Sequence, residues 1–398
     1  MPLADVALGT IIVMGAIALA ALVPALLRLA ILPAVVLELL FGVVIGPQGL
    51  GLVAPNPLLD TLSEFGLAVL FLIAGLEINP AQLRGTPTRL ALQGWAASLG
   101  LALALAFAGQ ALGLFPAAGF VAIAIATTAI GTLMPILKDQ GLLGPPYGPH
   151  VLACGTAGEA LPLAALSLIL AGAAGFGTQG LILVGFALVS FTVIALAGRV
   201  KELPMPGILR ATMSSASQFP VRLSLFLAVA FALIGTRFEL DLILGAFVAG
   251  AVMRALLPED LHDDLMTRLS AVGYGLLIPI FFVTSGMKLD VAALAASPAA
   301  VALVPVFVVL MLVVRGAPVL WLHRAHLSLR ARLGLGLHCG TQLPLVVAVT
   351  ALAVERGVMP GWCAAALVTA AVVTVILFPA LASLVLRGAG AQVPDRRT

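Results

Sequence analysis

The chain has 398 residues, of which 62% are hydrophobic and only 9% are charged, and its mean hydropathy is +1.20. A soluble domain carries roughly 25% charged residues, so this composition excludes a soluble domain. The apolar runs are about twenty residues long, which is the length of a helix that crosses a bilayer. The strands of a membrane barrel are shorter and alternate in polarity. We therefore predict an all-α polytopic membrane protein whose first partner is the lipid bilayer. The formal net charge of +3 says little about other partners, and we expect no nucleic acid.

Charges, prolines and glycines divide the chain into thirteen apolar segments. We expect spans at approximately residues 5–27, 33–49, 60–78, 88–112, 116–137, 150–171, 178–198, 219–236, 241–257, 270–287, 299–322, 331–353 and 360–386. No basic residues precede the first segment and no cleavage pattern follows it, so we expect it to be a span and not a signal peptide.

Lysine and arginine are unequally shared between the loops. Sixteen of the twenty lie in odd-numbered loops and the C-terminal tail, three lie in even-numbered loops, and Arg315 lies within a span. By the positive-inside rule, the N-terminus is expected outside and the C-terminus in the cytoplasm. A transmembrane domain is predicted over residues 1–387. The cytoplasmic tail, residues 388–398, is expected to be too short for a soluble regulatory domain.

Short matches between the two halves predict an internal repeat. Val69–Pro80 resembles Ile280–Val291 at an offset of 211, and the small residues of Gly42–Gly46 match those of Ala246–Gly250. The copies are seven spans apart, so they point in opposite directions through the membrane. This is the inverted-topology repeat of many secondary transporters, with repeats predicted at about 33–171 and 241–386.

A third match predicts two broken helices. Gly131, Thr132 and Pro135 form a Gly-Thr-x-x-Pro motif in span 5, and the same motif recurs in span 12 at an offset of 209. Its second copy consists of Gly340, Thr341, Gln342, Leu343 and Pro344. Proline removes a backbone donor, and irregular backbone at membrane depth is tolerated only where it is buried in protein or lines a water-filled cavity. We predict that both spans are discontinuous there. The alternative is that these residues only kink ordinary spans.

Two opposite charges lie well inside predicted spans. Glu159 lies near the middle of span 6, and Arg315 lies in span 11. Each is costly alone in a bilayer, so we expect them to pair and predict that Glu159 belongs to a functional site. The alternatives are a protonated structural glutamate and an arginine that anchors a tilted span.

The remaining ionisable groups suggest no cofactor site. We interpret Glu38 and His338 as structural, and Glu77 and Lys288 as interfacial charges. The three cysteines have no metal-ligand spacing and are interpreted as packing residues.

Five segments carry a resemblance to a known family, the monovalent cation:proton antiporters, which are bacterial Na+/H+ and K+/H+ exchangers. They are residues 33–51, 71–85, 127–143, 276–290 and 334–359. The resemblance covers essentially the whole chain. It implies thirteen spans in an inverted-repeat fold with two crossed discontinuous helices. It also implies alternating access, a homodimer and a place in the bacterial inner membrane.

The resemblance also implies roles for individual residues. By position, Glu159 matches the carboxylate that binds the cation and the proton, and Arg315 matches a basic residue of the eleventh span. Thr128, beside Thr127, matches the polar residue in the unwound part of span 5. Gln342 falls in the second broken helix, where many members have an acidic residue.

The residue before the carboxylate departs from the family pattern. Gly158 stands where the family has Asp, Asn or Gln, and Glu159 stands where it usually has Asp. Without a neighbouring carboxylate, electroneutral one-for-one exchange is expected.

The expected function is therefore secondary active exchange of a monovalent cation, Na+ or K+, for protons, with Glu159 binding both. Such exchange serves pH homeostasis. A Na+-coupled organic-anion transporter of similar fold and a channel-like potassium efflux protein are the alternatives. An intramembrane enzyme lacks any supporting motif. No cofactor is expected, and the only metal expected is the transported cation at Glu159.

Overall fold

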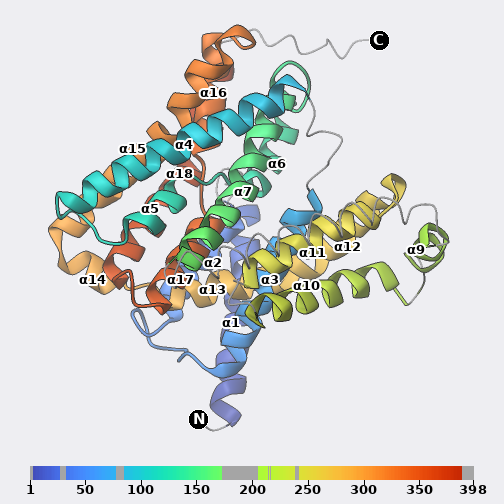
Figure 1. Ribbon diagram of the computed structural model, residues 1–398. Helices are drawn as coiled ribbons and strands as arrows, with labels where there is room; N and C mark the ends of the chain where they lie inside the picture. Colours follow the sequence, from blue (N-terminus) through green and yellow to red (C-terminus); the bar gives the residue numbers. More distant parts are fainter. Residues whose placement is uncertain are drawn as a thin grey trace. The chain divides into compact units, whose positions relative to one another are not determined.

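The computed structural model describes residues 3–26, 33–77, 85–172, 205–213, 215, 217–237 and 242–387 (Figure 1). All regular structure in these residues is helical, which confirms the predicted fold class. In the first half the helices are α1 (Leu3–Leu26), α2 (Ala34–Ile45), α3 (Pro57–Glu77), α4 (Thr86–Ala111), α5 (Ala118–Ile125), α6 (Ile130–Asp139), α7 (Tyr147–Gly172) and α9 (Met205–Met213). In the second half they are α10 (Phe219–Arg237), α11 (Leu242–Leu256), η1 (Glu259–Leu261), α12 (His262–Val272), η2 (Gly273–Leu277), α13 (Ile278–Met287), α14 (Val291–Ala296), α15 (Pro298–Leu322), η3 (His323–Ala325), α16 (Leu329–Gly340), α17 (Pro344–Glu355) and α18 (Gly361–Arg387).

Helices occupy twelve of the thirteen predicted spans. The remaining span, 178–198, and the predicted tail, 388–398, lie outside the described residues. Seven helical stretches in the described part are long and apolar enough to cross a membrane. Predicted spans 5 and 12 each hold two helices, α5 with α6 and α16 with α17.

The chain divides into two compact units. The first comprises Met1–Ala20, Glu38–Asn79 and Leu163–Lys288, and the second comprises Ala21–Leu37, Pro80–Pro162 and Leu289–Thr398. Each unit therefore combines segments from both predicted repeats.

In the first unit, α3 packs closely against α11 (Figure 1). A Cβ atom added to Gly250 would overlap the carbonyl oxygen of Leu72, and one added to Gly75 would overlap that of Phe247. The two backbones are therefore in direct contact, as is common where small residues line the interface of membrane helices.

The same contact occurs between α2 and α13 of this unit. A Cβ atom on Gly42 would overlap the carbonyl oxygen of Val283, and one on Gly286 would overlap that of Leu39. Val283 and Gly286 correspond to Leu72 and Gly75 of α3 at the offset of 211 found in the sequence. Each copy of the predicted repeat thus packs its glycine helix on the other copy, which is the geometry expected of an inverted repeat.

The structure corrects the register of this glycine match. The sequence match makes Gly46 the counterpart of Gly250. In the structure the counterpart of Gly250 is Gly42, because each contacts the equivalent backbone of its partner helix, and the offset is therefore 208. Small residues spaced by four can be aligned one helical turn away with equal success. The backbone contact distinguishes the two registers, and the sequence pattern does not.

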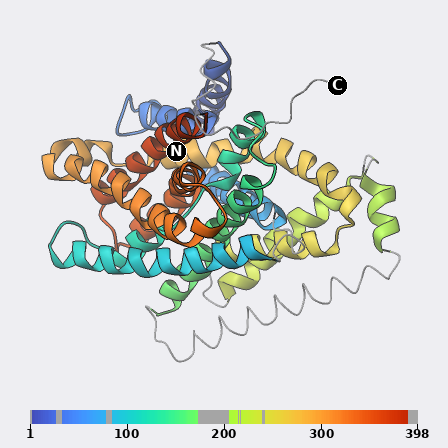
Figure 2. The ribbon, with the colours of Figure 1, turned by 90° about the horizontal axis from the view of Figure 1, so that it is seen from above.

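In the second unit, α4 and α15 lie side by side (Figure 1, Figure 2). Helix α15 also contacts α16 and α18, and α5 contacts α4 and α17. Helices α4, α15 and α18 thus pack against the two broken spans.

The second break falls where the motif predicts it, and the first does not. Helix α16 ends at Gly340 and α17 begins at Pro344. In span 5 the break covers Ala126–Ala129, and the motif residues Gly131, Thr132 and Pro135 lie inside α6. Pro344 opens its helix, where a missing N–H costs nothing, so only the second motif marks a helix start.

Gly250→Val is expected to destabilise the protein, because the added side chain must displace the backbone of α3. Overpacking of this kind typically costs about 1–3 kcal/mol. The midpoint of thermal unfolding in detergent measures the effect. Gly15→Val in α1 is the matched control, because nothing lies within 4 Å of a Cβ atom there. Equal midpoints for the two variants would contradict the close contact.

Candidate cation site at the two helix breaks

The carboxyl end of α5 is capped by one side chain from α4 and one from the linker between α16 and α17. Trp95 Nε1, from α4, donates to the carbonyl oxygen of Ala126 at 3.2 Å. Gln342 Nε2 donates to the carbonyl oxygen of Ile125 at 2.9 Å. Terminal carbonyls have no partner within their own helix, and in a membrane an unsatisfied one is costly. These two bonds let α5 end inside the protein.

The carboxyl end of α16 is capped in return by the first break. Thr128 Oγ1 donates to the carbonyl oxygen of Cys339 at 2.7 Å. The backbone N–H of Ala129 donates to the carbonyl oxygen of Thr341 at 2.9 Å. The linker after α5 therefore caps the carboxyl end of α16, and the linker after α16 caps the carboxyl end of α5. The carbonyl groups at each break depend on the other linker for their hydrogen bonds.

A hydroxyl of α18 holds the second linker. Thr374 Oγ1 accepts from the backbone N–H of Gln342 at 3.1 Å and lies 3.2 Å from its carbonyl oxygen. Thr374 and Gln342 are both fully buried. This contact fixes the backbone from which the Gln342 side chain extends.

Arg315 on α15 is buried, with 3% of its surface exposed, and uses all three of its nitrogens. Nε and Nη2 donate to Thr128 Oγ1 at 3.1 and 2.9 Å. Nη2 also donates to the carbonyl oxygen of Cys154 at 3.2 Å, and Nη1 donates to Ser98 Oγ at 3.3 Å. Because a guanidinium can only donate, Thr128 Oγ1 accepts from Arg315 through its lone pairs. The hydroxyl proton of Thr128 is then donated to the carbonyl oxygen of Cys339.

A proline in α7 frees the carbonyl that binds the first linker. The backbone N–H of Thr128 donates to the carbonyl oxygen of Gly158 at 2.8 Å. That oxygen would normally accept from the residue four positions on, which is Pro162 and has no N–H. The pair Gly158 and Pro162 thus creates an acceptor in mid-helix, and Thr128 uses it.

Thr128 and Arg315 together leave no room for a side chain at position 158. A Cβ atom on Gly158 would lie 2.6 Å from Arg315 Nη2 and would overlap Thr128 Oγ1. This steric limit accounts for glycine where the resemblance leads one to expect a polar residue. Glu159, the next residue, is half-buried. Its pairing with Arg315 stays a prediction.

The structure therefore brings together five of the predicted site residues: Thr128, Gly158, Arg315, Thr341 and Gln342. Thr127 is buried beside them, but its hydroxyl turns back to the carbonyl oxygen of Ala124 at 2.9 Å. Gly340 and Pro344 bound the second linker. Gly131, Thr132 and Pro135 belong to α6 and take no part in the reciprocal caps.

Three contributors were missed from the sequence: Trp95, Ser98 and Thr374. Each is a hydrogen-bonding side chain in an otherwise apolar span. Attention to charged residues alone passes over such groups, although polar groups inside a membrane span usually have partners. Ser98, for example, stands before the apolar run Leu99–Phe107 of α4.

A second buried polar cluster joins α7 to the ends of α15 and α16. Tyr147 Oη lies 2.6 Å from His338 Nδ1, and Cys154 Sγ lies 3.8 Å from His323 Nε2. The ring of His150 packs edge-on against His323, with centroids 5.1 Å apart. Within the described residues, no three His, Cys, Asp or Glu side chains are grouped so that they could hold a metal ion.

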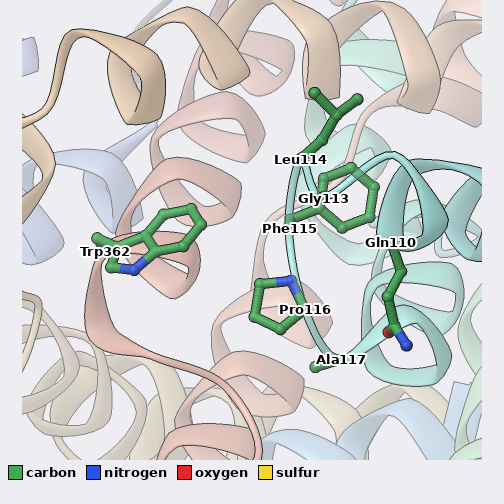
Figure 3. Close-up of a pocket in the computed structure, with 7 residues that line it drawn as sticks. All are labelled: Gln110, Gly113, Leu114, Phe115, Pro116, Ala117 and Trp362. Atoms are coloured by element: carbon green, nitrogen blue, oxygen red, sulfur yellow. The ribbon is translucent and has the colours of Figure 1, made fainter.

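A cavity of about 350 Å³ lies apart from these residues (Figure 3). It is lined by the turn between α4 and α5 and by Trp362 of α18. Gln110 borders it, and its Oε1 accepts from the backbone N–H of Ala118 at 2.8 Å. None of the predicted site residues lines it.

Two discontinuous helices that cap each other around a buried arginine, in an apolar polytopic chain, are typical of a membrane transporter. A family model described as "Sodium/hydrogen exchanger, transmembrane" matches residues 17–388. The chain therefore belongs to the sodium/hydrogen exchanger family, as its resemblance implies, and is a multi-pass membrane protein of the transporter class.

Known relatives and a solved structure agree with this membership. The Bacillus subtilis protein YjbQ is 27% identical over 367 residues, a match that covers 87% of this chain and 58% of YjbQ. A Na+/H+ antiporter of Enterococcus hirae is 28% identical over 269 residues, covering 65% of this chain and 67% of that protein. The chain thus spans little more than half the length of YjbQ. The structure of the sodium proton antiporter MjNhaP1 from Methanocaldococcus jannaschii has the same fold, with a TM-score of 0.66 at 16% identity. The match covers 96% of this chain and 98% of MjNhaP1.

Gly158→Asn is expected to destabilise the protein strongly in the wild-type background and less so beside Arg315→Ala, where Thr128 still blocks part of the space. The asparagine needs the space that Thr128 and the guanidinium fill, and residues in contact typically couple by about 0.5–3 kcal/mol. Unfolding midpoints of the wild type, both single variants and the double variant measure this coupling. Strictly additive effects would contradict the steric account of Gly158.

Proposed function

We propose that this chain exchanges a monovalent cation, Na+ or K+, for protons across the membrane by alternating access, with Glu159 as the shared carboxylate. The observation that carries the proposal is the position of Glu159. It follows Gly158, whose carbonyl oxygen binds the linker of the first broken helix at 2.8 Å. In a member of the sodium/hydrogen exchanger family, a carboxylate beside two broken helices is well placed to hold an ion.

The chemistry of such a site is a competition for one anionic group. A carboxylate can hold an alkali cation or a proton, and each excludes the other. Broken helices add backbone oxygens and helix-end dipoles, which favour a cation at a carboxyl end. Half-burial removes part of the water that would otherwise compete for the ion.

One-for-one exchange follows from the surroundings of Glu159. The residue before it cannot be a second proton carrier, because Arg315 and Thr128 fill the space of its side chain. The charged group there is the guanidinium of Arg315, which donates hydrogen bonds and accepts none. One carboxylate then carries either one cation or one proton, and we propose that the exchange is electroneutral.

The sequence supplies the orientation and setting of this proposal. Sixteen of twenty basic residues lie in the loops and tail assigned to one side, so we propose an outside N-terminus and a cytoplasmic C-terminus. We further propose a homodimer in the bacterial inner membrane, with a role in pH homeostasis. The family resemblance supports these points.

Glu159→Gln is expected to abolish cation-dependent proton flux, because the amide holds neither a proton nor a net charge for the cation. Flux is measured in proteoliposomes with a pH-sensitive dye inside, adding Na+, K+ and Li+ in turn. Glu355→Gln is the matched control, since Glu355 is exposed at the end of α17. Its flux is expected to equal that of the wild type. Wild-type flux from Glu159→Gln would refute the proposed function.

A further inference from the structure

Gln342 has a buried oxygen that the protein itself does not use. The residue is fully buried in the linker between α16 and α17. Its Nε2 donates to the carbonyl oxygen of Ile125, and its backbone N–H bonds to Thr374. Its side-chain oxygen, Oε1, is buried and has no hydrogen-bond partner.

The orientation of the amide is fixed by its neighbour. The Ile125 oxygen can only accept, so the group that faces it must be the NH2 of Gln342. Reversing the amide would place two acceptor oxygens against each other. The free atom is therefore the oxygen, because only this rotamer of the terminal amide can bond to Ile125.

An unpartnered buried amide oxygen costs free energy, and such atoms are rare in folded proteins. A methionine or leucine would fill similar space without this cost. The hydrogen bond to Ile125 gives the side-chain nitrogen of Gln342 a structural role. It gives none to the side-chain oxygen. A desolvated, neutral oxygen of this kind is what replaces water around an alkali cation in protein sites.

The backbone places Gln342 and Glu159 at the same linker. The N–H of Thr128 bonds to Gly158, the residue before Glu159, at 2.8 Å. The N–H of the next residue, Ala129, bonds to Thr341, the residue before Gln342, at 2.9 Å. Two adjacent peptide groups of the first break are thus bonded to the residues that precede the proposed carboxylate and the free amide.

We propose that Gln342 Oε1 is a ligand of the transported cation, and that the bond from Nε2 to Ile125 aims it. This inference rests on the proposed exchange function. Glu159 supplies the charge and Gln342 supplies a neutral oxygen from the other broken helix.

The test compares Gln342→Met with Gln110→Met in proteoliposomes. Gln342→Met keeps the length of the side chain and removes both the cap and the oxygen. Gln110→Met makes the same substitution at the other end of α5, where Gln110 Oε1 accepts from the N–H of Ala118, and leaves Gln342 intact. For Gln342→Met we expect an apparent KM for the cation at least about tenfold above wild type, the factor that corresponds to about 1.4 kcal/mol of binding. For Gln110→Met we expect an apparent KM within about twofold of wild type.

A wild-type KM in Gln342→Met would overturn the inference, as would an equal rise in KM for Gln110→Met. If Gln342→Met does not reach the membrane, Gln342→Asn takes its place, because it keeps the amide and shortens its reach by one methylene. A raised KM is expected there too, and an unchanged KM overturns the inference.

The assay separates this inference from the proposed function. If the wild type exchanges cations, Glu159→Gln does not, and the Gln342 variants keep the wild-type KM, only the ligand role fails. If the wild type shows no cation-dependent proton flux, both fail.

Discussion

The hydrogen bonds that cross between the two helix breaks are the interaction on which the rest of the site depends. Thr128 caps α16 at Cys339, and Gln342 caps α5 at Ile125. In the bilayer core, water does not hydrogen-bond to the free backbone groups of a helix end. A broken span is therefore stable only where protein groups supply the missing hydrogen-bond partners. Each break supplies them for the other, and this exchange brings two segments more than 200 residues apart in sequence to one place.

Arg315 sets the chemistry of that place through its volume as much as its charge. Its guanidinium binds Thr128, Ser98 and the Cys154 carbonyl, and it fills the space beside Gly158. A fixed cation thereby stands where a second titratable side chain could otherwise lie. The proposed stoichiometry of one proton per cation follows from this packing. Gly158 is the feature of the sequence that reflects the packing.

The sequence predicts the parts of this fold that depend on composition and fails on those that depend on backbone contact. Long apolar runs place the spans, and Pro344 marks the second break because proline starts helices. The first break lies upstream of its motif, since side-chain caps from distant helices determine where α5 ends, and no local pattern records them. The register of Gly42 against Gly250 is hidden for a similar reason. The place of Arg315 was predictable from the cost of charge in a membrane, whereas Trp95 and Ser98 are neutral and give a weaker signal.

The central claim is that one carboxylate at the helix breaks holds either one cation or one proton. The most direct test is the apparent KM for the cation in proteoliposomes, measured across a range of acidic to neutral pH. Competition with a single proton predicts that KM rises about tenfold for each unit fall in pH at the acidic end, while the maximal rate at saturating cation stays constant. A rise approaching a hundredfold per unit, or a KM that does not change with pH, would contradict the account.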